Sequence, residues 1–259
     1  MRTFIFLILF LSYINYSAHS QEQLTFTFRV VKNSFETTCQ LVCDKEIHMW
    51  TEMSKLQPIR PDANYVEPQN YQKEKLFKNF KSGEIYSLYR ILEKMFYVKD
   101  PLHIQDWMLS DTVAVITGQR CKGAQTSFRG RKYVAFYAPD IPIASGPWKF
   151  QGLPGMILKV ETIQDNEKYV FECIRIEKTS KNISKEMDDF LSSVPKKNSF
   201  KDWESFKKDF ESYANLYIKK TKSSLQTNGN TGYVATIRVT NYPEIFHPDI
   251  QTKGVSFDY

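Results

Sequence analysis

Hydrophobic and polar residues alternate over many short stretches of this chain. Strict alternation is typical of a strand that is buried on one face only. It predicts strands at residues 23–31, 38–43, 47–51, 112–118, 132–138, 156–163 and 168–177. Short turns at 129–131 and 164–167 separate neighbouring strands, as in antiparallel hairpins. The pattern therefore indicates one continuous antiparallel sheet.

Three stretches are less regular. Residues 57–75 are polar and carry three prolines, which predicts a loop. Residues 85–98 are aromatic and apolar without a single period, so a strand and a helix both remain open. We expect residues 119–125 to turn through Gly123.

The clearest helix is predicted at residues 200–219. Ser199 followed by Asp202 resembles a capping box. An aromatic face follows i, i+3, i+4 spacing through Phe200, Trp203, Phe206, Phe210, Tyr213, Ala214 and Tyr217. A polar loop at 223–231 and a closing strand at 233–240 complete the pattern, and Asp188 and Asp189 mark the start of a second helix. The predicted fold is mainly β (α+β): a long curved antiparallel sheet or half-barrel with one or two amphipathic helices packed on it.

The segment from Asp140 to Glu161 is dense in glycine and proline. Glycine is needed where the backbone takes a positive φ, and proline fixes φ near −65°. We expect Leu153 to Met156 to form a type II turn with Gly155 at its positive-φ position. The candidate binding or structural positions of this loop are Asp140, Pro142, Gly146, Pro147, Trp148, Phe150, Gly152, Leu153, Pro154 and Gly155, with Trp148 and Phe150 as its side-chain anchors.

The first twenty residues have the pattern of an export signal. Arg2 precedes an apolar run at 4–11, and Ala18-His19-Ser20 fits a small-x-small cleavage site. The run is too short for a membrane span, which takes about 20 residues. We therefore expect cleavage, a single domain over residues 21–259, no transmembrane segment, and a location in the periplasm or at the outer membrane or cell surface.

The formal net charge of +6 lies largely in the C-terminal third. A solvated helix face and contact with an anionic surface such as lipid head groups both account for it. An exported chain without a recognition motif argues against nucleic acid as a partner.

Four cysteines, Cys39, Cys43, Cys121 and Cys173, follow the signal. In an oxidising compartment they can form up to two disulfides, in three possible pairings, or remain buried free thiols. Cys39 and Cys43 are four residues apart in a predicted strand, roughly 13 Å. A disulfide needs Cα atoms within about 7 Å, so we expect these two not to pair.

Few residues of this sequence form a pattern typical of a metal-binding or catalytic site. Cys39, Cys43, His48, Met49 and Met53 form a hairpin rich in soft-metal ligands, although the pattern favours a Met- and Cys-lined core face.

The Gly/Pro segment offers Ser145 and Lys149 as nucleophiles, but their S-x-x-x-K spacing matches no catalytic motif. Asp140 and Glu161 are expected to cap backbone amides or to pair with Arg129 or Arg131. No cofactor is implied.

Sequence motifs resemble a known family. DIPI, GPWKF and GLPGMILKVE, all within 140–161, closely resemble the GLPGLI family of exported proteins of Bacteroidota, with Met156 where that family has Leu. The resemblance extends over about 104–177, through Asp106-Trp107, Ile116–Gly118, Cys121, Ala124 and Phe128–Arg131; residues 241–245 are similar to the family's usual ending. It implies an exported protein, often encoded near TonB-dependent transporters, with no assigned catalytic residues.

These observations predict an exported, envelope-associated accessory or binding protein. Its partner would be an outer-membrane transporter or another envelope protein, or its ligand a lipid or a peptide. Aromatic residues make up 15% of the chain, which fits either a ligand groove or an ordinary β-rich core. The alternatives are a periplasmic copper- or zinc-handling protein and a hydrolase that uses Ser145 with a distant histidine.

Overall fold

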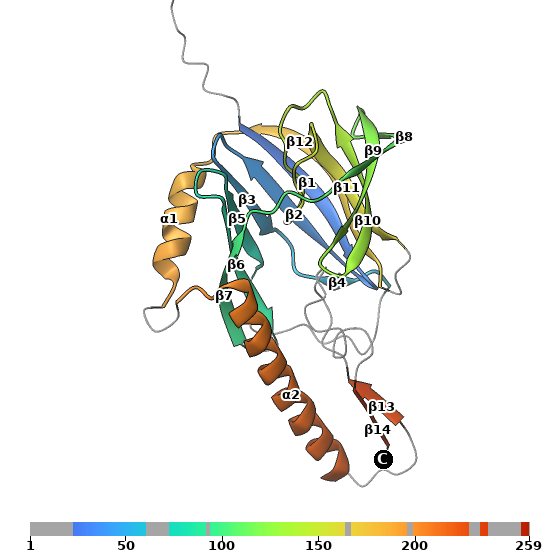
Figure 1. The fold of residues 1–259 in the computed structure, drawn as a ribbon, viewed down its shortest axis with the longest axis vertical. Coiled ribbons are helices and arrows are strands. Elements are labelled where there is room, and N and C mark those ends of the chain that lie inside the picture. The colour runs from blue at the N-terminus through green and yellow to red at the C-terminus, as the bar shows by residue number, and fades with distance from the viewer. Residues whose placement is uncertain are drawn as a thin grey trace, which may run out of the picture.

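A computed structural model describes residues 23–60, 73–91, 94–163, 167–195, 199–227, 234–237 and 255–258. The predicted export signal at 1–20 and the family-like ending at 241–245 lie outside these residues. Twelve of the described strands form one open antiparallel sheet in the order β7-β6-β5-β3-β2-β1-β12-β11-β10-β9-β8, with β4 beside β2 (Figure 1). The predicted mainly β fold with a long antiparallel sheet is confirmed.

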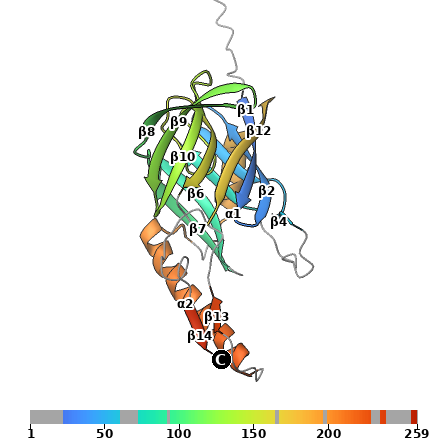
Figure 2. The ribbon, with the colours of Figure 1, turned by 90° about the vertical axis from the view of Figure 1, so that its right-hand side faces the viewer.

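The strands are β1 (Gln23–Lys32), β2 (Phe35–Cys43), β3 (Ile47–Glu52), β4 (Gln57–Pro58), β5 (Lys75–Asn79), β6 (Glu84–Ile91), β7 (Lys94–Pro101), β8 (Met108–Ile116), β9 (Gln119–Phe128), β10 (Arg131–Ala138), β11 (Met156–Ile163) and β12 (Tyr169–Thr179). The sheet consists of two meanders, β1 to β7 and β8 to β12. They join where β1 pairs with β12, from Gln23 opposite Thr179 to Lys32 opposite Tyr169. Figure 2 shows how the sheet curves.

Strand alternation divides the sheet into two faces. We call the inner face the one that carries Phe26, Phe28, Leu41 and Trp50, which belong to the largest buried cluster. The outer face carries Val42, Met49 and Phe77, which belong to a second cluster. Cys39 and Leu41 share the inner face, as their spacing predicts.

Two helices pack on the sheet. The helix α1 (Ile183–Ser193) buries Ile183, Met187 and Phe190 against the outer face. Its N-terminus is capped by Asn182, whose side-chain oxygen accepts a 3.0 Å bond from the Lys185 N–H. Asp188 and Asp189 lie in the middle of this helix, not at its start.

The helix α2 (Trp203–Thr227) packs Phe206, Phe210, Ala214 and Ile218 against Tyr89, Phe96 and Val98 of β6 and β7. It extends beyond the end of the sheet (Figure 1). Asp202 is its capping residue, accepting a 2.8 Å bond from the Ser205 N–H, so the helix begins later than the predicted residue 200. Phe200 instead packs with Tyr86 and Tyr97 beside α1.

Other expectations are corrected by the structure. Residues 119–125 belong to β9, and the turn lies at Thr117 and Gly118. A Cβ at Gly123 would lie 1.9 Å from Thr112 Oγ1 of the bulged strand β8, so a larger residue there would require this side chain to shift. Residues 84–91 and 94–101 form the paired strands β6 and β7, so both described parts of the open stretch are strands and not helices.

The predicted loop at 57–75 is partly wrong, since it includes β4 and the start of β5; residues 61–72 lie outside the described segments. Within 233–240, the strand β13 (Val234–Ile237) pairs with β14 (Val255–Asp258) in a separate two-stranded sheet. It therefore does not close the main sheet.

Candidate functional site

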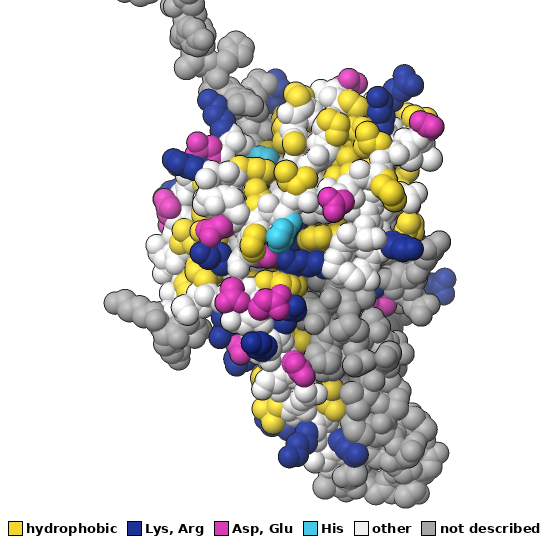
Figure 3. Space-filling view, in the orientation of Figure 1, with side chains coloured by type: hydrophobic (Ala, Val, Ile, Leu, Met, Phe, Trp, Pro, Cys, Tyr) yellow, Lys and Arg dark blue, Asp and Glu magenta, His cyan; other side chains and the backbone are white. Residues whose placement is uncertain are grey.

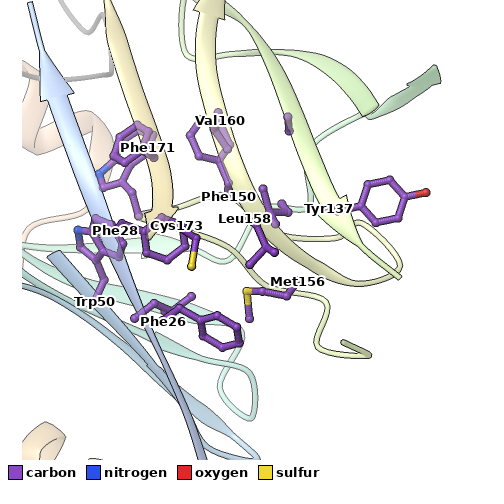
Figure 4. Close-up of a cluster of buried hydrophobic side chains, with 14 of the residues drawn as sticks. Phe26, Phe28, Trp50, Tyr137, Phe150, Met156, Leu158, Val160, Phe171 and Cys173 are labelled. Carbon is purple, nitrogen blue, oxygen red and sulfur yellow. The ribbon is translucent and has the colours of Figure 1, made fainter. Parts of the chain in front are cut away.

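The Gly/Pro loop, residues 139–155 between β10 and β11, fills the inner face of the sheet. Trp148, Phe150 and Leu153 are buried in the inner-face cluster. The ring of Phe150 lies 4.8 Å from that of Tyr133, and Trp148 stacks at 6.3 Å on Phe171. Figure 4 shows the strand side chains of this core. Such aromatic pairs contribute about 0.5–1.5 kcal/mol each beyond area burial, so the loop is itself part of the core.

The remaining candidate positions of the loop divide by exposure. Gly146, Pro147 and Gly155 are buried, whereas Asp140, Pro142, Gly152 and Pro154 are exposed. Trp148 has a φ of 51°, a left-handed conformation that costs a large side chain roughly 1–3 kcal/mol. A 3.1 Å bond from the Phe150 N–H to the Pro147 carbonyl closes this turn. The packing of Trp148 holds the strained backbone in place.

The predicted type II turn at Leu153 to Met156 is wrong. The N–H of Gly155 donates to the Leu153 carbonyl at 2.8 Å, an i to i+2 bond around Pro154. The N–H of Met156, which would close a type II turn, instead donates to the Ile141 carbonyl at 2.9 Å. Gly155 does have a positive φ, but at 147° it is far from the type II value of about 80°.

A fully buried lysine, Lys78 on β5, anchors the loop to the first meander. Its Nζ donates at 2.8 Å to the carbonyl oxygens of Gly146 and Phe150 and lies 3.3 Å from Ser145 Oγ. Burial lowers the pKa of Lys78 to about 7. A charged amine can donate to all three oxygens, and a neutral amine can donate to the two carbonyls and accept from the Ser145 hydroxyl. Both protonation states therefore keep three partners.

A second buried lysine, Lys149, joins the loop to β7 and to α2. Its Nζ lies 2.9 Å from Asp100 Oδ2, and Arg129 contacts both oxygens of the same carboxylate at 2.8 and 2.6 Å. Burial alone would raise the pKa of Asp100, but Lys149 and Arg129 outweigh it and hold that pKa below its usual value. The guanidinium of Arg129 also lies 3.5 Å from the ring centre of Trp203, at the start of α2.

Other charged groups near the loop have different partners from those expected. Arg129 pairs with Asp100, Arg131 pairs with Glu167, and Glu161 pairs with Lys159 at 3.2 Å. Asp140 is exposed at the start of the loop. The carboxylates that bracket the loop therefore do not supply its anchors.

A cavity of about 330 Å³ lies where the first part of the loop meets the β2–β3 hairpin. Its walls are formed by Cys43, Asp44, Lys45, His48, Phe80, Pro142, Ile143 and Ala144. This volume is near the lower end of the range for small-molecule sites, roughly 300–1,000 Å³. The cavity brings a candidate metal-ligating cysteine and histidine next to the Gly/Pro loop.

Cys43 and His48 face each other across the hairpin. They are directly opposite in the β2–β3 register, one step beyond the 3.1 Å bond from the Asp44 N–H to the Ile47 carbonyl. His48 Nε2 lies 3.1 Å from the Asp44 carbonyl oxygen, which can only accept, so this bond places the ring proton on Nε2. Nδ1 is buried and has no hydrogen-bond partner among the described residues.

The protonation states of this pair follow from burial and from Lys78. Burial, aided by Lys78, lowers the pKa of His48 to about 3. Burial raises the pKa of the Cys43 thiol to about 12, against the opposing effect of Lys78. Near neutral pH the imidazole is therefore neutral and the thiol protonated.

The other candidate metal ligands are not brought to this place. Cys39 shares the inner face but lies opposite Glu52, Met49 is on the outer face in the α1 cluster, and Met53 is exposed. Within the described residues, no three His, Cys, Asp or Glu side chains come together as a metal site. All four cysteines lie in described segments and are free and buried.

The two candidate nucleophiles of the loop have separate environments. Ser145 is fully buried and its hydroxyl lies against Lys78, not against a histidine. Lys149 is also fully buried and pairs with Asp100. A substrate cannot reach either group in this conformation.

Sequence reasoning missed Lys78 and Asp100. Lys78 follows the apolar residues Leu76 and Phe77 in KLFKN, and alternation with Phe77 places it on the inner face. That spacing was the available signal, but lysine at such a position usually lies on the surface. Its partners are mostly backbone carbonyls, which leave no pattern in a sequence.

The two edges of the sheet differ. At β7 the Lys99 N–H donates to the Lys201 carbonyl at 2.8 Å, and the Lys201 N–H donates to Tyr97 at 2.9 Å, so the segment before α2 covers this edge. At β8 no further strand follows among the described residues. The apolar side chains on β8 and just before it are 63–75% exposed: Ile104, Met108, Leu109, Val113 and Val115. Figure 3 shows hydrophobic side chains on the upper right of the molecule, where β8 and β9 lie.

The fold and the site together define a mainly β protein whose open sheet is filled on its inner face by a loop of its own chain. Residues 102–159 match the family model Porph_ging, described as a protein of unknown function. The matched segment contains β8, β9, β10, the Gly/Pro loop and the first half of β11. It overlaps most of the way with the region that carries the GLPGLI resemblance, and that family name stays a prediction.

Two structures of PNGF-II are similar to this chain. For the C2 crystal form the sequence identity is 18% and the TM-score is 0.46, and the alignment covers 73% of this chain and 32% of the PNGF-II chain. In the P21 form the identity is 16% with a TM-score of 0.47, covering 73% and 33%. The chain thus spans about a third of the length of these proteins. No curated protein matches the chain. Neither described helix is both long and apolar enough to cross a membrane.

Proposed function

We propose that this chain is an exported accessory protein of the cell envelope that binds a partner protein along the edge strand β8. The export pattern of residues 1–20 and the resemblance to exported GLPGLI proteins of Bacteroidota support the location. The observation that carries the binding mode is the exposed apolar edge of the sheet.

A partner strand fits this edge better than a ligand fits the core. Trp148 and Phe150 occupy the inner face, where a lipid would otherwise bind. An edge strand presents unpaired backbone N–H and C=O groups, and proteins usually protect such edges with charge, proline or a covering segment. The β7 edge is covered by Lys201, whereas β8 carries no proline and a single charged residue, Asp111, so its only protective features are that residue and the bulge between Ser110 and Val113.

The side chains along the β8 edge indicate which kind of segment the partner would supply. Added strands gain affinity from main-chain hydrogen bonds and specificity from alternate side chains. Val113 lies opposite Lys122 and Val115 opposite Arg120, so cations flank the apolar side chains. We infer that the partner supplies an extended segment with apolar side chains and acidic neighbours, on an outer-membrane transporter or another envelope protein.

A site-specific photo-crosslinker at Met108 in producing cells tests this proposal. We expect a discrete adduct with another protein, because Met108 is an exposed position on β8. Adding Val113→Lys and Val115→Lys should abolish the adduct, since two charges would be buried against the partner. Ile174→Lys is the matched control, because Ile174 is an exposed apolar residue on the interior strand β12 and should leave the adduct unchanged.

Three outcomes would contradict the proposal. These are no adduct at Met108, an adduct that survives the double β8 substitution, and an adduct that is lost equally with Ile174→Lys. An adduct with a second copy of this chain would assign the edge to self-association instead.

A further inference from the structure

We propose that Cys43 and His48 form a two-coordinate binding site for a soft monovalent metal ion, Cu⁺, in the cavity beneath the Gly/Pro loop. Cys43 would bind through Sγ and His48 through Nδ1. This inference is independent of the docking proposed for β8.

The geometry of the hairpin carries the proposal. Cys43 and His48 are directly opposite in register, next to the turn that closes β2 and β3. The pair beside a hydrogen-bonded pair is the closely spaced kind, with Cβ atoms roughly 4.5–5.5 Å apart. Metal–sulfur and metal–nitrogen bonds of about 2.3 and 2.0 Å place the two ligand atoms of a linear site roughly 4 Å apart. Both residues line the cavity.

The tautomer of His48 leaves its Nδ1 lone pair available to bind a metal ion. Its Nε2 is held by the Asp44 carbonyl, which fixes the tautomer with an unprotonated Nδ1. That nitrogen is buried and has no hydrogen-bond partner within the described segments. An unsatisfied buried acceptor is unfavourable, and a metal ion would supply the missing partner.

Charge balance selects a monovalent ion. On binding, Cu⁺ bonds to Sγ and the thiol proton leaves to solvent, so one positive charge replaces another. The copper–thiolate–imidazole unit is then neutral, which a buried site tolerates. A divalent ion would instead leave an additional positive charge in this buried site, next to Lys78, which lies opposite His48 in the β3–β5 register.

Ligand number also argues for Cu⁺ rather than zinc. Structural zinc sites take four ligands, and catalytic ones take three from the protein. In the described parts of the chain no such group of three assembles. Thiolate is a soft ligand that selects Cu⁺, and Cu⁺ accepts linear coordination by two ligands. Of the soft-metal ligands in the hairpin sequence, the structure therefore assigns Cys43 and His48 and leaves out Cys39, Met49 and Met53.

An anaerobic titration of the full mature chain with Cu⁺, against a chromogenic Cu⁺ chelator, tests the site. We expect one Cu⁺ per chain, and X-ray absorption should report one sulfur and one nitrogen ligand. Cys43→Ser and His48→Gln should each weaken binding by about tenfold or more. Cys39→Ser is the matched control, because it removes a buried thiol from the same strand and the same face; it should leave the affinity unchanged.

The proposal is overturned if the wild-type chain holds no Cu⁺ against the chelator, or if Cys39→Ser weakens binding as much as Cys43→Ser. It is also overturned if the absorption spectrum reports sulfur ligands alone. This spectrum is recorded on the wild-type chain, so the test stands even if Cys43→Ser or His48→Gln fails to fold.

Discussion

Lys78 Nζ donates a 2.8 Å hydrogen bond to the carbonyl oxygen of Gly146. The lysine belongs to the meander β1 to β7 and the glycine to the loop of the other meander. A second 2.8 Å bond reaches the Phe150 carbonyl, so one amine fixes both sides of the Trp148 turn. The loop is thus held to the opposite half of the sheet by a charge-capable group in the core.

Replacing Lys78 by Met should destabilise the protein by about 2–4 kcal/mol. The carbonyls of Gly146 and Phe150 would lose a buried donor, at roughly 1–3 kcal/mol each, while the burial of an amine is relieved. The measurement is the free energy of unfolding in urea. Lys132→Met is the control, because Lys132 is exposed on β10 and its loss should change stability by less than about 0.5 kcal/mol. Equal stability of the two variants would refute the anchoring role.

The stability should rise with pH between about 7 and 9. An amine with a pKa near 7 when folded and 10.5 when unfolded binds fewer protons in the folded state between these values. Stability then increases with pH, by up to about 1.4 kcal/mol per unit for one proton. Above pH 9 the raised pKa of Cys43 acts in the opposite direction. Urea midpoints at pH 7 and 9 check this, and Lys78→Met should remove the increase.

A related acid effect is expected from His48. Its pKa falls from 6.5 to about 3 on folding, so the unfolded chain binds an extra proton between these values. Stability should therefore fall as the pH is lowered from 6.5 towards 3. In His48→Gln the loss between pH 6.5 and 4 should be smaller than in the wild type. An unchanged pH profile in this variant would contradict the buried neutral histidine.

The sequence predicted a strand at several places where one face of the sheet is buried and the other is wet, as at β10, although it placed a turn within the half-buried strand β9. It left the choice between strand and helix open at β6 and β7 because both faces of these two strands are covered. Tyr89 and Phe96 face α2, whereas Leu88 and Tyr97 pack beside α1. Polarity then no longer alternates, and a strand resembles a buried helix.

The site was predictable only in part. Cys43 and His48 belong to the predicted ligand set, but proximity in sequence also grouped them with Met49. Strand alternation sends Met49 to the outer face, and hairpin register places Cys43 opposite His48. Lys78 could not be assigned, because its role depends on backbone carbonyls of a loop far away in the sequence.

Replacing Asp100 by Asn should destabilise the fold by about 3–5 kcal/mol. The Asp100 carboxylate is 1% exposed, and it forms ion pairs with both the fully buried Lys149 and Arg129. Removing one member of a buried ion pair leaves an uncompensated charge. Asp189→Asn is the control, since its pair with Lys185 on α1 is exposed and contributes about 0.3–0.5 kcal/mol. Calorimetry measures the free energy of unfolding of both variants. If Asp100→Asn lowers it as little as the control does, Asp100 is excluded as an anchor.

Gly155 provides the sharpest test of the loop geometry. Its φ is 147°, and an added Cβ would lie 2.3 Å from the Ala138 carbonyl oxygen and 2.9 Å from Pro139 Cα, both backbone atoms that cannot move aside. We expect Gly155→Ala to cost more than about 3 kcal/mol or to prevent folding, because backbone strain and a steric clash add. Gly83→Ala separates the two effects. Gly83 also has a positive φ, 70°, but nothing lies within 4 Å of its added Cβ, so about 1–2 kcal/mol is expected. Chemical unfolding of both variants measures the difference. If they are equally destabilised, the close approach of Gly155 to β10 does not determine the course of the loop.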